Sequence, residues 1–424
     1  MASPPRSLRA AVTALCRGST TISLCSLLAA HFFVAASPAW GQAAPAGITD
    51  ERLRQYIEQS RTAATARLPA EVVAQRVQAR ARLLAQGEAA LRNGDTAQAQ
   101  TAFDKAATYE HAADTEMALV RTYMQAGNYR QATSFGAHTA GAHRQVVAGA
   151  VLYGWLLSLG GQDVVAKKLL ETAAQTFPND AQVRTVRQLL DSGSGSPTGD
   201  LRKPPVRLAP YATGDRVAAS ASPVASGVLV HSGRHAWVPL SLLGTRSAAP
   251  KLWVRNGLGQ TRLAAVYQRF PELGLALLHW PQALPLSAAA AMPARDAFPG
   301  SPGYAVAYIP AADADAAWPR LSTGLQGMPV GNVPGLRQLG MTLPAGSQGA
   351  AVLDGAGQVV GIALPGPGGK DQVVMASLLR PALGKLAPTP PTAAAAAPIA
   401  AGRLPIDEVY ENALRISLQV LAKP

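Results

Sequence analysis

The sequence predicts a multidomain α+β protein in which helical hairpins precede a β-rich domain. At roughly 150 residues per domain, the 424-residue chain is long enough for two to three domains. Between residues 50 and 190, apolar residues recur at three- and four-residue spacing and only two prolines occur, which is typical of amphipathic helices. After about residue 214, short apolar runs alternate with Gly and Pro turns, which indicates the strands of a barrel or sandwich.

Residues 1–43 are predicted to be a secretory signal peptide. Arg6, Arg9 and Arg17 precede an apolar run over 20–37, and small residues at 41 and 43 provide a cleavage site. A transmembrane anchor and a lipoprotein signal are the alternatives. Together with the Arg- and Ala-rich composition, the signal indicates export to the periplasm of a Gram-negative bacterium, with the membrane contacted only during export.

Cleavage after residue 43 would remove both cysteines, Cys16 and Cys25, so the mature chain would hold no disulfide. It would also lower the net charge from +13 to +10, because three arginines and no acidic residue lie in that segment. The remaining positive charges are spread along the chain, and no phosphate-binding Gly-rich loop, zinc pattern or RNA-binding signature occurs. We therefore expect no nucleic-acid partner and no cofactor.

The helical segment contains a repeat. Gly94, Gly127 and Gly161 are spaced by 33 and 34 residues, and each is expected to end a helix in the left-handed conformation. Small and bulky residues recur around these turns, and the repeat positions are Gly87, Gly94, Ala99, Phe103, Ala106, Gly127, Tyr129, Ala132, Gly154, Gly161, Ala166, Leu170, Ala173 and Pro178. The pattern resembles the tetratricopeptide repeat, with units at about 81–113, 114–147 and 148–181, and residues 50–80 are expected to form preceding helices.

The resemblance implies a concave groove that binds peptides or partner proteins, and packing or dimerisation without a ligand is the alternative. Three histidines lie in the repeats, His111, His138 and His143. They lack the i, i+4 spacing to acidic residues that a helical metal site would show, so we expect ordinary surface or core histidines and no metal.

A Ser/Gly-rich segment followed by Lys203, Pro204 and Pro205 predicts a flexible linker over 191–213. The expected strands after it are 227–230, 236–240, 251–254, 262–267, 275–279, 303–309, 358–364 and 372–375.

Residues 346–362, GSQGAAVLDGAGQVVGI, resemble the nucleophile region of trypsin-like serine proteases, especially the HtrA type. Gly346, Ser347, Gln348 and Gly349 take the place of the oxyanion loop, with Gln348 at the position of the nucleophilic serine. Upstream, residues 226–230 resemble the family's Ser-Gly-hydrophobic strand. Counting from it puts Ser241 at the place of the catalytic histidine.

The segment LGLALL at 273–278 resembles the strand that carries the catalytic aspartate, and Gly274 stands at the aspartate position. The resemblance covers about 215–385 and implies a chymotrypsin-like double β-barrel. A glutamine amide cannot replace the serine, a serine hydroxyl cannot replace the histidine as base, and glycine offers no carboxylate.

We therefore expect a pseudoprotease that acts as a scaffold or regulator in the bacterial envelope and binds peptides or proteins through the repeat groove or the vestigial cleft. An active serine endopeptidase with relocated residues, Ser347, His235 and Glu272, is one alternative, and barrels with a purely structural role are another. The oligomeric state is left open.

The tail begins with a Pro/Ala-rich linker over 386–403, semi-extended by composition. Residues 404–424 then place apolar residues on one stripe and predict an amphipathic helix, with Asp407 and Glu408 near its N-terminal end. Such a helix must bury its stripe either on the protein's own domains or on a partner.

Overall fold

A computed structural model describes residues 51–63, 68–230, 232–244, 250–285, 292–311, 313–331, 333–384, 386 and 402–423. The predicted signal peptide, most of the Pro/Ala linker and His231 lie outside these residues. Within the described part of the chain, no helix is both long and apolar enough to cross a membrane.

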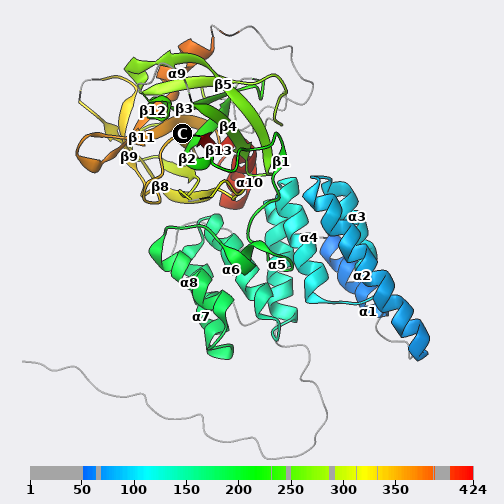
Figure 1. The fold of residues 1–424 in the computed structure, drawn as a ribbon. Coiled ribbons are helices and arrows are strands. Elements are labelled where there is room, and N and C mark those ends of the chain that lie inside the picture. The colour runs from blue at the N-terminus through cyan, green and yellow to red at the C-terminus, as the bar shows by residue number, and fades with distance from the viewer. Residues whose placement is uncertain are drawn as a thin grey trace, which may run out of the picture. The chain divides into compact units, whose positions relative to one another are not determined.

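The helical region consists of paired, stacked helices (Figure 1). Their bounds are α1 Glu51–Ala63, α2 Ala70–Arg92, α3 Thr96–Ala107, α4 Ala113–Ala126, α5 Tyr129–Ala142, α6 Val147–Leu159, α7 Asp163–Thr176 and α8 Ala181–Ser192. Gly94, Gly127 and Gly161 lie in the turns of the three hairpins with φ of 81°, 79° and 79°. The predicted glycine turns are confirmed, because these left-handed angles favour a residue without Cβ.

The other glycines of the repeat set the distance between the two helices of a hairpin. A Cβ on Gly87 would lie 2.5 Å from the Phe103 ring, and a Cβ on Gly154 would lie 3.0 Å from the Leu170 side chain. In the first and third units the small residue thus fits against the bulky residue, as the repeat pattern predicts.

The segment between α8 and the barrels packs on the helices, although its composition predicts a flexible linker. It begins with a 3₁₀-helix, η1 (Gly199–Arg202), and buries Leu201, Val206 and Leu208 in the same apolar core as the helices. The Tyr211 amide donates to Gln125 Oε1 at 3.0 Å, and the Tyr211 hydroxyl donates to Glu88. For residues 199–211 the flexible-linker prediction is therefore wrong. The composition suggested flexibility, but four apolar residues of the segment are buried: Leu201, Val206, Leu208 and Ala209.

Two six-stranded antiparallel barrels follow, as the resemblance implied. The strands are β1 Thr213–Gly214, β2 Ser222–Val230, β3 His235–Pro239, β4 Lys251–Asn256, β5 Gln260–Phe270, β6 Leu275–His279, β7 Pro302–Ala307, β8 Arg320–Pro329, β9 Leu336–Gly340, β10 Ala350–Leu353, β11 Val359–Pro365, β12 Asp371–Met375 and β13 Ser417–Lys423. The first barrel runs β5-β4-β13-β2-β3-β6 and closes through β5–β6, and β1 adds a short parallel pairing to β5. The second runs β10-β11-β12-β9-β8-β7 and closes through β7–β10, with helix α9 (Ala376–Leu383) packed on β11 and β12.

The C-terminal segment is a helix followed by a strand. Helix α10 covers Ile406–Ile416, and β13 then pairs with β2 on one side and β4 on the other. The prediction of a single helix over 404–424 is wrong after residue 416, and the first barrel is not contained in 214–385. Leu418, Gln419, Val420 and Leu421 are all fully buried, so both faces of the segment are covered and the ladder satisfies its backbone.

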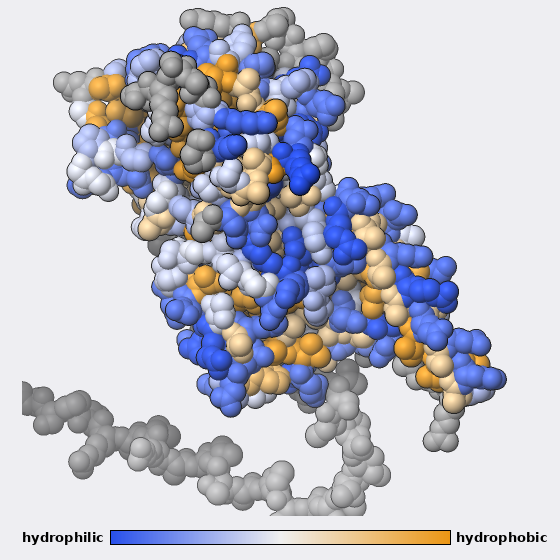
Figure 2. Space-filling view, in the orientation of Figure 1, coloured by the Kyte–Doolittle hydropathy of each residue, from blue (hydrophilic) through white to orange (hydrophobic). Residues whose placement is uncertain are grey.

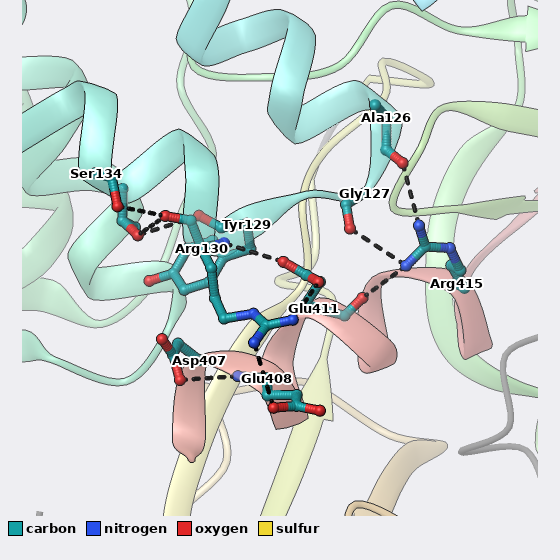
Figure 3. A network of polar contacts seen from close by, with 10 residues as sticks. Ala126, Gly127, Tyr129, Arg130, Ser134, Asp407, Glu408, Glu411 and Arg415 are labelled. Carbon is teal, nitrogen blue, oxygen red and sulfur yellow. Dashed lines mark hydrogen bonds and ion pairs between the residues drawn. The ribbon is translucent and has the colours of Figure 1, made fainter. Parts of the chain in front are cut away.

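Helix α10 docks on the protein's own helical region and first barrel (Figure 3). The Arg130 amide and guanidinium donate to the Glu411 carboxylate at 3.0 and 3.3 Å. Arg415 donates to the carbonyls of Ala126 and Gly127, each at 3.2 Å, where the last turn of α4 exposes its acceptors. The charged face of α10 thus ties the turn between α4 and α5 to the C-terminal strand.

Large apolar side chains on the surface are dispersed over several elements. Val77 of α2 is 60% exposed, Val164 of α7 is 82% exposed, and Met328 of β8 is 66% exposed. On the face shown in Figure 2, hydrophobic and hydrophilic residues alternate over both the helical region and the barrels. Apolar surface does not merge into one broad patch on that face.

Candidate functional site

Two of the three positions that the sequence places at the triad, Ser241 and Gln348, are in contact, and the third, Gly274, contacts the residue before Ser241. Ser241 lies in the 3₁₀-helix η2 (Leu240–Leu243) that follows β3, and its hydroxyl donates to Gln348 Oε1 at 3.3 Å. The amide of Leu240 donates to the Gly274 carbonyl at 2.9 Å, just before β6. The structure thus joins Ser241 to Gln348 by a hydrogen bond and places Gly274 against Leu240, the residue before Ser241.

The loop before β10 is held by backbone contacts with both barrels. The Gln348 carbonyl accepts from the Ser226 amide at 2.8 Å, and the Gly349 amide donates to the Ala363 carbonyl at 2.8 Å. A Cβ on Gly349, whose φ is 76°, would lie 2.1 Å from the Ser226 carbonyl oxygen, so only glycine fits. The Gln348 side chain also donates to the Val224 carbonyl at 3.4 Å, which fixes its amide against β2.

The residues of the relocated-triad hypothesis make other contacts. The Ser347 hydroxyl, 8% exposed, donates to the Tyr308 carbonyl at 3.2 Å. The His235 ring packs against Tyr267 with centroids 5.5 Å apart, at the end of β3 that follows the hairpin turn. Glu272 lies exposed in the 3₁₀-helix η3 (Pro271–Leu273). Ser347 is therefore engaged by a backbone carbonyl rather than by a base.

Tyr308 forms part of the buried floor of this site. Its amide donates to the Ser226 hydroxyl at 2.8 Å, and its own hydroxyl donates to the Ser417 carbonyl at 3.3 Å. Complete burial raises the pKa of Tyr308 far above its usual value, so the phenol stays protonated and does not act as a base.

Two amide groups in the loop remain available to a ligand. The Ser347 amide donates to the Pro344 carbonyl at 3.0 Å. Among the residues that the structure describes, the amides of Gly346 and Gln348 donate to no protein acceptor. Gly346 is exposed, so its amide is open to solvent.

Side chains that could hold a metal ion do not gather at this loop within the described residues. They gather instead in the helical region, where donor atoms of His111, Glu116 and His143 lie within 4.8 Å of one another. The sequence spacing did not reveal this clustering. The i, i+4 criterion considers a single helix, whereas these residues come from separate segments.

No family model matches this chain. No curated protein matches it either. Among solved structures, the MamO protease domain from Magnetospirillum magneticum is 22% identical over 39% of this chain and 91% of its own, with a TM-score of 0.30. The Rv3671c protease from M. tuberculosis, active form, is 16% identical over 42% and 83%, with a TM-score of 0.30. The HtrA-type protease AlgW with a decapeptide is 16% identical over 38% and 51%, with a TM-score of 0.28. Likenesses at this level assign neither activity nor ligand.

Proposed function

We propose that this protein is a non-catalytic relative of trypsin-like serine proteases that binds peptides or partner proteins at the 346–349 loop and serves as a scaffold or regulator in the bacterial envelope. The observation that carries the proposal is the contact between Ser241 and Gln348 beside Gly274. The export part of the proposal depends on the predicted signal peptide.

Acyl transfer on this fold needs a nucleophile, a base hydrogen-bonded to it, and a carboxylate that orients the base. In the contact described above, the Ser241 hydroxyl faces an amide oxygen, which cannot take its proton near neutral pH. Gly274 has a φ of 65°, so a side chain at that position would also be strained. A carbonyl seated on the free amides of Gly346 and Gln348 would be held but not attacked.

The helical region supports this reading as a scaffold. Its hairpins with glycine turns at intervals of 33 and 34 residues support assignment to the tetratricopeptide type. The packed segment 199–211 contacts α2 through Glu88 and α4 through Gln125, so the chain covers these helices itself. We therefore assign peptide binding to the exposed loop between the barrels and assign internal packing to the repeats.

Fluorescein-labelled β-casein, a largely unfolded polypeptide, tests the proposal with the mature chain, residues 44–424. We expect casein to raise its anisotropy on binding and to remain intact on a gel. Ser241→Trp should weaken binding at least about tenfold, because an indole beside Gln348 would obstruct the loop. Thr172→Trp, at an exposed position of α7, is the matched control and should bind normally. Casein fragments, or binding unaffected by Ser241→Trp, would overturn the proposal.

A further inference from the structure

Three histidines and one glutamate converge at the end of the second helical hairpin. His111 lies in the turn before α4, and Glu116 lies in the first turn of α4. His138 lies near the end of α5, and His143 is the residue that caps it. Because α4 and α5 pack as a hairpin, the beginning of one lies beside the end of the other, and four potential ligands meet.

Their donor atoms surround one carboxylate oxygen. The Nε2 atoms of His111, His143 and His138 lie 2.7, 3.2 and 3.4 Å from Glu116 Oε1. The Nε2 atoms of His111 and His138 are 3.3 Å apart. In a tetrahedral zinc site with bonds of about 2.0–2.1 Å, neighbouring donor atoms are about 3.3 Å apart. These four separations, from 2.7 to 3.4 Å, are close to that edge length.

Hydrogen bonding alone does not satisfy this cluster. Among the described residues, neither oxygen of Glu116 nor Nε2 of His143 has a hydrogen-bond partner of normal geometry, although all three atoms are buried. The Glu116 side chain is 0% exposed, and burying an ionised carboxylate without a matching cation is costly. A single cation at the centre would satisfy the carboxylate and all three ring nitrogens at once.

The histidine rings of the cluster lie close to solvent. His111, His143 and His138 keep 29%, 15% and 14% of their side-chain surface exposed. Arg80 of α2 pairs with Asp114 and with Glu110 rather than with Glu116.

We propose that His111, Glu116, His138 and His143 bind one Zn²⁺ ion. Three imidazoles and a carboxylate form a borderline donor set suited to zinc, and four protein ligands leave no open position for substrate. The role of the ion is structural: it fastens the turn before α4 to the end of α5. The same hairpin receives Arg415 and Glu411 of α10, so the site stabilises the platform on which the C-terminal segment docks.

The mature chain, residues 44–424, is stripped with a chelator and titrated with Zn²⁺ by calorimetry. We expect one zinc per chain. Glu116→Gln and His143→Asn should each lower the affinity more than about 100-fold, because even outer-shell changes cost 10–100-fold. His279→Asn, a histidine of β6 outside the cluster, is the matched control and should bind zinc as the wild type does.

A second measurement needs no variant. X-ray absorption of the zinc-loaded wild type should show three imidazole nitrogens and one oxygen in the first shell, and Co²⁺ in its place should give the intense visible bands of tetrahedral coordination. Absence of stoichiometric zinc, a shell with fewer than three imidazoles, or unchanged affinity in well-folded Glu116→Gln would each overturn the proposal.

Discussion

Replacing Glu88 by glutamine tests how the packed segment 199–211 is fastened to the helices. Glu88 accepts two hydrogen bonds of 3.0 Å from Arg121, whose side chain is only 3% exposed, and a third from the Tyr211 hydroxyl. Glu88→Gln keeps the shape but leaves the Arg121 charge buried without a counter-ion. Breaking a buried ion pair lowers the unfolding free energy by about 3–5 kcal/mol. Because the Glu88 side chain is 13% exposed, we expect a loss at the lower end, about 3 kcal/mol.

Urea unfolding followed by the helical circular dichroism signal measures this loss. The control is Glu110→Gln, which removes the same kind of charge from a residue that is 61% exposed and 3.5 Å from Arg80. An exposed pair contributes at most about 1 kcal/mol, so the control should unfold almost as the wild type does. A loss from Glu88→Gln no larger than that of the control would refute the reasoning.

The same pair predicts a pH dependence. Burial alone raises the pKa of Glu88, but the Arg121 charge and the hydrogen bonds from Arg121 and Tyr211 bring it below its usual value. Its contribution to stability is therefore full above the unfolded pKa of about 4.3 and is lost as the pH falls through the lower folded-state value. The difference between wild type and Glu88→Gln should shrink over that acidic window, and a constant difference would contradict the assignment.

Three further substitutions test the packing. Leu418→Ala in β13 should lower the unfolding free energy by about 2–5 kcal/mol, because the side chain is fully buried, and a thermal melt showing almost no change would place it outside the core. Tyr410→Phe should lower the unfolding free energy by about 1 kcal/mol in a urea titration, because it removes the 2.7 Å hydrogen bond from the Tyr410 hydroxyl to the Pro319 carbonyl. An unchanged unfolding free energy would mean that this hydrogen bond is absent. Gly160→Ala should lower the unfolding free energy by about 1–3 kcal/mol in the same titration, because its Cβ would lie 2.1 Å from Tyr129 Oη. The control is the exposed Gly141→Ala, whose Cβ would have no atom within 4 Å and which should not destabilise the protein. Equal effects of the two substitutions would refute the contact.

Periodicity predicted the helical hairpins well because each glycine turn and its neighbouring helices are local features of the chain. The eight expected strands also lie within or overlap observed ones, since alternation and turn residues mark them. Strand β8, which contains Gly324 and Gly327, is not among the expected strands. In the structure they sit where a Cβ would lie 2.6 and 1.8 Å from backbone oxygens of β9, so close strand approach requires them.

Strand β13 was mistaken for helix because its apolar spacing continues that of α10. The strand conformation of β13 depends on its tertiary pairing with β2 on one side and β4 on the other, which local sequence patterns do not show. The sequence did not predict the histidine cluster for a related reason. His111, Glu116 and His143 come together because the hairpin folds, and not because of their spacing on one helix. The contact between Ser241 and Gln348, 107 residues apart, could be anticipated because the family resemblance supplied the long-range order that local patterns lack.

Labelling with a fluorophosphonate probe, which reacts only with activated serines, tests the central claim most directly. The mature chain is incubated with the probe beside an active trypsin-like protease as positive control. The Ser241 hydroxyl faces an amide oxygen and the Ser347 hydroxyl faces a backbone carbonyl, so we predict no labelling. Stoichiometric labelling that is abolished by Ser347→Ala or Ser241→Ala would contradict the non-catalytic assignment.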